Sequence, residues 1–311
     1  VRVTPDTAAP VTLAPTLSPQ GRGRRKGRGG FCYTLRMHYT GGAEHWTDKN
    51  GIKLFLWRKM PADGASKATI LFVHGSSTAG QAAFDLQVPG LTDTSLMDWF
   101  AGRGFDTWCL DNEGYGRSDK SRPINFDTDN GAADIEAASA YIAGVTGRPK
   151  LMLFGTSAGS QKGGLFAMRH PERIARLALD AMFWTGKDSP NLAQRMAQLP
   201  ELRSLNRRPF DPAVITRVFN REGPGLAEPE LVEAFGKAVA DLDDSIPTGT
   251  YLDACTRLPL LDPAKITVPT WGIEWARAHL AAGTPVVLEC YMHNLSADER
   301  LEQVALLLDA V

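Results

Sequence analysis

The residues best suited to chemistry lie in the segment 151–160, where a short apolar run leads into Gly155-Thr-Ser157-Ala-Gly159. A serine between two glycines, after a strand and before a helix, fits the G-x-S-x-G pattern of a nucleophile held on a tight turn. The glycines are needed because such a turn leaves no room for side chains two positions either side of the serine. Helical sequence follows from Ala158 to His170, and the free amide groups at its start would favour developing negative charge. We therefore predict Ser157 as a nucleophile; the alternative is a small-residue turn that packs a helix on a strand.

Composition excludes several classes of function. With 311 residues and 43% apolar content, the chain can bury a large core as one big domain or two ordinary ones. A net charge of −1 gives no support to nucleic-acid binding by the body of the protein. No apolar run approaches membrane-spanning length, and the start lacks the pattern of a secretory signal, so we expect a soluble, cytoplasmic protein with no membrane partner. The four cysteines are far apart in the chain and form no C-x-x-C pair: Cys32, Cys109, Cys255 and Cys290. No histidine stands at metal-ligand spacing either, so we predict no metal site.

The order of apolar runs predicts the fold class. Asn50-Gly51 is a strong signal for a two-residue hairpin turn between two extended segments. Buried strands are then expected at 68–75, 105–111, 151–154 and 174–180, and helices at 93–102, 132–143 and 158–170. Strands and helices that alternate in this way predict an α/β fold with a mostly parallel central sheet and helices on both faces. Its ligand site is expected at the carboxyl ends of the strands.

The rhythm changes outside this central part. Residues 1–40 are rich in Pro, Thr and Ala and then in Arg and Gly, which predicts a disordered basic leader. Residues 182–260 have helical spacing with no strand-like run, which predicts a helical cap inserted into the core. The core itself is predicted as residues 41–181 and 261–311, with two last strands at 266–271 and 285–289 and a terminal helix at 297–311.

Four motifs in order give the chain its resemblance to the α/β-hydrolase superfamily, over about residues 45–270. They are His74-Gly75, Asp111-x-x-Gly114-x-Gly116-x-Ser118, Gly155-x-Ser157-x-Gly159 and His170-Pro-Glu-Arg173. The chain looks most like bacterial serine hydrolases of the esterase type that carry a helical cap. The turn that carries the nucleophile in this superfamily is called the elbow. Dehalogenases and epoxide hydrolases of the superfamily place an aspartate there, whereas this chain has Ser157, which implies acyl transfer through an acyl-enzyme.

The resemblance implies an oxyanion hole and a base. The donors would be the backbone amide of Ala158 and that of Ser76 or Ser77 in the loop after His74. His74 itself is expected to position this loop rather than to take part in the reaction. Of the six histidines, the family order selects His293, in the loop after the last predicted strand; the alternative is a surface histidine.

Two carboxylates are candidates for the acid of the triad. Relatives usually carry an aspartate after the penultimate strand, and no aspartate lies between Asp262 and Asp298 here. Glu274 is nearest to that position, while Asp180 ends the strand after the elbow helix, where some dehalogenases of the superfamily carry their acid. We prefer Asp180, and its alternative role is to cap the next segment. A third possibility is that residues after Thr270 are rearranged, which would leave an impaired site.

These residues together predict a serine hydrolase that cleaves a small apolar acyl or aryl ester without a metal or organic cofactor. Met182, Phe183 and Trp184 at the root of the cap and Tyr251 near its end are candidate walls of the substrate site, with plain core packing as the alternative. The same residues could instead hydrolyse an amide, carbamate or lactone, or the fold could be a binding protein that has lost catalysis. Nothing in the sequence indicates the oligomeric state.

Overall fold

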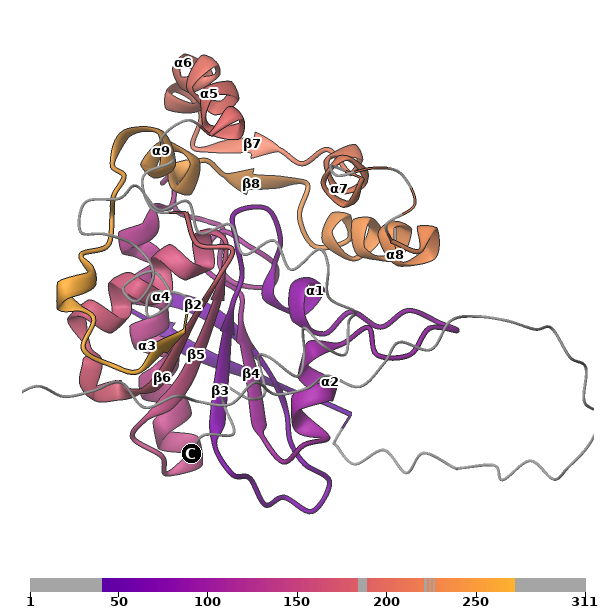
Figure 1. Cartoon of the computed structure of the whole chain (residues 1–311), viewed down its shortest axis with the longest axis vertical. Coiled ribbons are helices and arrows are strands. Elements are labelled where there is room, and N and C mark those ends of the chain that lie inside the picture. The colour runs from indigo at the N-terminus through magenta and orange to yellow at the C-terminus, as the bar shows by residue number, and fades with distance from the viewer. Residues whose placement is uncertain (1–40, 184–188, 221–222, 224, 226, 272–311) are drawn as a thin grey trace, which may run out of the picture. The chain divides into compact units, whose positions relative to one another are not determined.

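The structure is a computed structural model that describes residues 41–183, 189–220, 223, 225 and 227–271 (Figure 1). Its strands are β1 (Ala43–Lys49), β2 (Ile52–Lys59), β3 (Thr69–Val73), β4 (Asp106–Leu110), β5 (Leu151–Thr156), β6 (Ile174–Asp180), β7 (Arg207–Pro209), β8 (Ser245–Pro247) and β9 (Thr270–Trp271). Its α-helices are α1 (Gly80–Phe84), α2 (Leu96–Ala101), α3 (Thr128–Thr146), α4 (Ala158–Arg169), α5 (Pro190–Ala197), α6 (Leu199–Ser204), α7 (Ala213–Phe219), α8 (Pro229–Ala240) and α9 (Gly249–Thr256). The predicted leader, last strand and terminal helix lie outside the described residues.

One sheet runs through the described part of the chain in the order β1-β2-β4-β3-β5-β6-β9. Strands β4, β3, β5, β6 and β9 are parallel, and β2 joins β4 antiparallel, so the predicted mostly parallel sheet is confirmed. The predicted hairpin is also confirmed, because β1 pairs antiparallel with β2 through Asn50 and Gly51. Both turn residues have positive φ, 54° and 87°, as the favoured two-residue hairpin turn requires.

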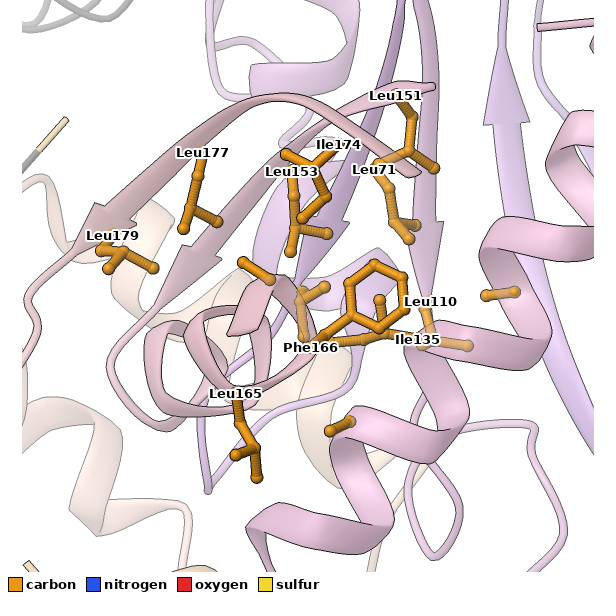
Figure 2. Packing of buried hydrophobic residues seen from close by; sticks show 14 of the residues in the cluster. Leu71, Leu110, Ile135, Leu151, Leu153, Leu165, Phe166, Ile174, Leu177 and Leu179 are labelled. Carbon is orange, nitrogen blue, oxygen red and sulfur yellow. The ribbon is translucent and has the colours of Figure 1, made fainter. Parts of the chain in front are cut away.

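Helices cover both faces of the sheet, and alternate residues of each strand meet different helices. Leu71 and Val73 of β3 belong to a buried cluster with residues of α3 and α4, part of which is drawn in Figure 2. Ile70 and Phe72, one position out of phase, pack with residues of α1 and α2 on the other face. Each such side chain contributes about 1.5–3 kcal/mol when it is fully buried. The two clusters hold β3 and β5 firmly, and the candidate residues project from the ends of these strands.

Helix ends were harder to predict than the strands. α2 begins at Leu96 rather than near residue 93, because the Ser95 side chain accepts from the Asp98 amide and caps the helix. α3 begins earlier than predicted, since Asp127 caps it by accepting from the Asn130 amide at 2.9 Å. The strand predicted at 266–271 is reduced to Thr270–Trp271, and a 3₁₀ turn at Pro263–Lys265 lies four residues before it.

Helices α5–α9 occupy the segment predicted as a helical cap, but this segment also contains strands that were not predicted. β7 and β8 pair antiparallel, with Arg208 opposite Ile246. The segment is joined to the core by specific contacts: Arg207 Nη1 donates to the Gly114 carbonyl at 2.8 Å, and Asp253 Oδ2 accepts from the Thr128 amide at the start of α3 at 2.8 Å. No helix in the described part of the chain is long and apolar enough to cross a membrane.

Candidate active site

Ser157 lies on a strained turn between β5 and α4. Its backbone has φ 54° and ψ −120°, a region that residues other than glycine seldom adopt and that costs about 1–3 kcal/mol. The turn is fixed by main-chain bonds: the Ser157 amide donates to the Asp180 carbonyl at 2.9 Å, and the Ser160 amide donates to the Ser157 carbonyl at 3.0 Å. The Ser157 side chain, which stands at the N-terminus of α4, makes no capping hydrogen bond there. The hydroxyl is therefore presented beside the helix start instead of being used to cap it.

Two glycines make this turn possible, and the steric requirement predicted for them is confirmed. A Cβ on Gly155 would lie 2.4 Å from the Gly159 carbonyl oxygen. A Cβ on Gly159 would lie 2.1 Å from the carbonyl oxygen of Val73. Both contacts are with backbone, which cannot move aside as a flexible side chain can. Because neither glycine has a side chain, the elbow can pack directly against the backbone at the end of β3.

The loop after β3 is held next to the elbow by His74. A Cβ on Gly75 would lie 3.3 Å from the Ser157 Cβ and 3.6 Å from its Oγ, so the loop borders the serine closely. His74 is fully buried; its Nδ1 donates to the Gly75 carbonyl at 2.8 Å and its Nε2 accepts from the Asn112 amide at 3.1 Å. Burial, helped by the nearby Lys162 charge, lowers the pKa of His74 well below its usual value. With both ring nitrogens engaged in the neutral form, His74 fixes the loop and has no lone pair free to act as a base.

Ser76 and Ser77, the predicted amide donors, are tied to other parts of the chain. The Tyr115 hydroxyl donates to the Ser76 carbonyl at 3.1 Å, and Thr250 Oγ1 lies 3.0 Å from Ser76 Oγ. Ser77 Oγ lies 3.3 Å from the Tyr251 hydroxyl. Ala158, whose amide is the other predicted donor, is the buried first residue of α4. The loop and the helix start thus flank Ser157.

Asp180, the preferred acid, lies at the end of β6, beside the residue that precedes the nucleophile. Its Oδ2 accepts from Thr156 Oγ1 at 2.7 Å. Burial raises the pKa of Asp180 above its usual value, although the bonds from Thr156 and from the Ala181 amide act in the opposite direction. The carboxylate is therefore held close to the elbow in a partly desolvated position.

The other predicted site residues fall in different places. His293, Glu274 and Trp184 lie outside the described residues. Met182 is buried in the core cluster with α3 and α4, whereas Phe183 is partly exposed and its carbonyl accepts from the Gln161 amide group. Histidines in the described part other than His74 contact groups away from the elbow, with Tyr141 beside His45 and Glu136 and Glu172 beside His170.

The Asp111 motif has a structural role. The buried Asp111 accepts from the amides of Gly80, at 2.7 Å, and Arg117, at 2.9 Å. A Cβ on Gly116 would lie 2.1 Å from Asp111 Oδ2, so a glycine is needed there. Burial raises the pKa of Asp111 to about 6, and the two amide bonds oppose that rise. The motif therefore shapes the turn after β4, beside the loop that carries Ser76.

Lys162, one turn along α4 from the elbow, is a buried lysine that residue type and spacing do not predict. Its side chain is fully buried, its Nζ donates to Asn112 Oδ1 at 2.6 Å, and Gly131 leaves the space for its stem. Asn112 in turn donates to the buried Asp134, which also accepts from Lys49. Burial lowers the pKa of Lys162 from 10.5 to about 7, against the opposing charge of Asp134. A lysine in an amphipathic helix normally reads as solvent-exposed, and the only signal in the sequence is the glycine-rich helix around it.

We expect the free energy of unfolding to depend on pH through Lys162. Between about pH 7 and 10.5 the unfolded chain holds the lysine proton and the folded chain does not, so stability rises with pH by up to about 1.4 kcal/mol per unit. Lys162→Met removes this rise, although it leaves Asn112 Oδ1 without its donor at a cost of about 1–3 kcal/mol. Urea unfolding at pH 7.5 and 8.5 measures the slope, with the exposed Lys150→Met as the control. Equal slopes in wild type and Lys162→Met would show that Lys162 stays charged in the folded state.

A pocket of about 270 Å³ lies beside the loop after β3. Ser77 contributes to its wall together with residues of α5, β7 and α9, among them Arg195, Arg208 and Tyr251. Tyr251 was predicted as a wall residue of the substrate site. Within the described ranges, no group of His, Cys, Asp and Glu residues is arranged to hold a metal ion.

The parallel sheet, the strained serine turn at the end of β5 and the glycine contacts around it define the class of the protein. Residues 68–222 match the family model described as "alpha/beta hydrolase fold". The chain has the α/β-hydrolase fold.

Solved structures share this fold at low sequence identity. E-2-(acetamidomethylene)succinate hydrolase is 17% identical over 86% of this chain and 99% of its own, with a TM-score of 0.57. A hydrolase from Pseudomonas aeruginosa PA01 is 20% identical over 74% of this chain and 79% of its own, with a TM-score of 0.53. The epoxide hydrolase VrEH1 from Vigna radiata is 16% identical over 74% of this chain and 77% of its own, with a TM-score of 0.50. No curated protein matches the chain significantly. These likenesses concern the fold, which hosts several chemistries.

Proposed function

We propose that the protein is a serine hydrolase that cleaves a carboxylic ester or a related acyl bond through an acyl-enzyme. The observation that carries the proposal is the placement of Ser157, on a strained turn at the N-terminus of α4 and beside the Gly75 loop. A protein retains such strain mainly at functional sites. A serine rather than an aspartate at this position favours acyl transfer over the alkyl-enzyme chemistry of epoxide hydrolases.

In the proposed reaction, His293 takes the Ser157 proton while Oγ attacks the substrate carbonyl. The carbonyl oxygen becomes negative and accepts hydrogen bonds from the amides of Ala158 and of Ser76 or Ser77. The bond to the leaving oxygen then breaks, and His293 returns the proton to it. A water molecule, deprotonated by the same histidine, attacks the acyl-enzyme and releases the acid and Ser157. Each aimed amide lowers the barrier by about 3–4 kcal/mol.

Covalent labelling tests this proposal directly. We expect a fluorophosphonate probe to modify the folded protein once, on Ser157, with mass spectrometry locating the label. The neighbouring Ser160 is a matched control, because its hydroxyl is buried and lies 2.6 Å from the Gly155 carbonyl. Ser157→Ala and urea-unfolded protein should both remain unlabelled. An unlabelled Ser157 in folded wild-type protein would refute the proposed nucleophile.

The two candidate acids are separated by paired substitutions. If Asp180 orients the histidine, Asp180→Asn should lower kcat by about 10³- to 10⁴-fold, because the histidine loses its charged partner. Glu274→Gln should then change kcat by less than about tenfold, the range of groups outside the triad. Steady-state hydrolysis of one activated ester by both variants gives the answer, and the reverse ranking would assign the acid to Glu274.

A further inference from the structure

The pocket beside Ser77 carries two arginines on one aromatic ring. The guanidinium carbon of Arg208 lies 3.8 Å from the centre of the Tyr251 ring, and that of Arg195 lies 4.2 Å from it. Arg208 comes from β7, Arg195 from α5 and Tyr251 from α9, so three separate elements bring these groups together. We call this site the arginine pocket.

No carboxylate of the described residues forms an ion pair with either arginine, although the rest of the surface is rich in such pairs. Asp211 also lines the pocket, but its Oδ2 accepts from Arg217 at 3.1 Å and its Oδ1 accepts from the Ala213 amide. Arg208 Nη1 is buried and has no hydrogen-bond partner within the described ranges. A buried, unsatisfied donor beside a second positive charge is costly unless a ligand supplies the acceptor and the negative charge.

The electrostatics of Tyr251 point the same way. Burial acts to raise the pKa of its hydroxyl, yet the charges of Arg208 and Arg195, with hydrogen bonds from Ser77 and Arg208, leave the pKa below its ordinary value. The field that favours a phenolate there would favour any other anion in the pocket. The sequence analysis named apolar and aromatic residues as candidate walls, and of these Tyr251 lines this pocket together with the two arginines.

The arginine pocket is within reach of the nucleophile. Arg208 Nη2 donates to Ser77 Oγ at 3.3 Å. Ser77 is two residues from Gly75, which borders Ser157, and two residues of chain span at most about 7 Å. A ligand only a few bonds long could therefore join a group in the pocket to a carbonyl at Ser157.

We propose that the arginine pocket binds a free carboxylate of the substrate, so that the protein selects short esters with an anionic end over neutral esters of the same shape. The inference rests on the proposed hydrolase function and specifies its substrate class. Carboxylate is the chemistry that fits, since a planar guanidinium binds it through two parallel hydrogen bonds and two arginines supply enough donors for both oxygens. Arg208 would donate to the carboxylate, and Arg195 would add its positive charge to the site.

A matched substrate pair tests the preference. Monomethyl glutarate and methyl valerate differ only in a terminal carboxylate or methyl group, and acid release can be followed in a pH-stat for both. We expect the wild-type full chain to favour monomethyl glutarate in kcat/KM by about 10- to 100-fold, the worth of a charged hydrogen bond. Arg208→Gln and Arg195→Gln should each lower this ratio toward one, and the exposed Arg203→Gln should leave it unchanged. The ratio is the readout because Arg208 also contacts Ser77, so its loss can slow both substrates.

Binding separates this inference from the function on which it rests. Calorimetry with the Ser157→Ala protein at low salt should detect glutarate, and the signal should disappear when either arginine is also replaced by Gln. Equal turnover of both esters would overturn the anionic subsite and leave the hydrolase standing. Arginine-dependent glutarate binding without turnover of any ester would support the anionic subsite and overturn the hydrolase function. Inorganic phosphate bound as tightly as glutarate, or no binding of either together with no ester preference, would overturn the carboxylate assignment.

Discussion

Ser157→Ala is expected to lower kcat by about 10⁴- to 10⁶-fold, the cost of removing the nucleophile of a serine triad. KM should change little, because the hydroxyl adds little to ground-state binding. The exposed Ser204→Ala on α6 is the control for a serine outside the site and should keep full activity. Initial rates on an activated ester measure both variants. Residual activity within about tenfold of wild type would mean that another residue makes the acyl-enzyme.

The same position carries a second expected result, in stability. Ala at residue 157 keeps the positive φ of the turn, whereas glycine adopts it without strain. The free energy of unfolding of Ser157→Gly should therefore be about 1 kcal/mol higher than that of Ser157→Ala, and both variants should be inactive. Urea titrations of the two variants compare them. Equal stabilities would indicate that the turn stores no strain.

Gly159→Ala should destabilise the fold by about 3 kcal/mol or more, because the added methyl overlaps backbone and cannot be accommodated by a rotamer change. The clashing atoms are the carbonyl oxygens of Val73, at 2.1 Å, and His74, at 2.8 Å. Relief of the clash requires α4 to move away from the end of β3, which would also shift the loop beside Ser157. We therefore expect a lower urea midpoint together with reduced activity.

Gly144→Ala is the matched control for that substitution. Gly144 lies inside α3, it is exposed, and a Cβ there would meet no atom within 4 Å. Alanine at such a helical position should raise the free energy of unfolding by about 0.5–1 kcal/mol. If Gly159→Ala lowers the free energy of unfolding and Gly144→Ala raises it, the close approach at Gly159 is the cause of the loss. A Gly159→Ala protein as stable as wild type would contradict this close packing.

The central strands and the elbow could be predicted from sequence because their signals are local. β3, β4 and β5 are buried along nearly their whole length, and β6 is buried at Leu177–Leu179, so each of these strands contains an apolar run. The elbow needs only five consecutive residues. In contrast, β7 and β8 have three residues each and contain prolines, so no alternation marks them, and their pairing depends on tertiary contacts. α1, with five residues, is too short to show a helical period.

The sequence identified candidate site residues mainly where they follow one another in the chain. Ser157 came from the motif itself, and Ala158, Ser76 and Ser77 from the resemblance to the α/β-hydrolase superfamily. Arg208 contacts Ser77 across 131 positions, and Thr250 contacts Ser76 across 174, separations over which no spacing rule applies. The burial of Lys162 could not be predicted for a different reason. Residue type alone predicts an exposed lysine, and its neighbours Asn112 and Asp134 are brought close to it only by the fold.

The loop with Ser76 and Ser77 is secured by Thr250, Tyr251 and Arg208, all from the segment that lies outside the main sheet. A chimera that transplants the corresponding segment of another protein with this fold onto this core would therefore lose these anchors of the loop, whose amides we propose as oxyanion donors, along with the arginine pocket. If the proposed reaction takes place, exchange of the segment should alter its rate as well as its selectivity, so the two properties could not be engineered separately.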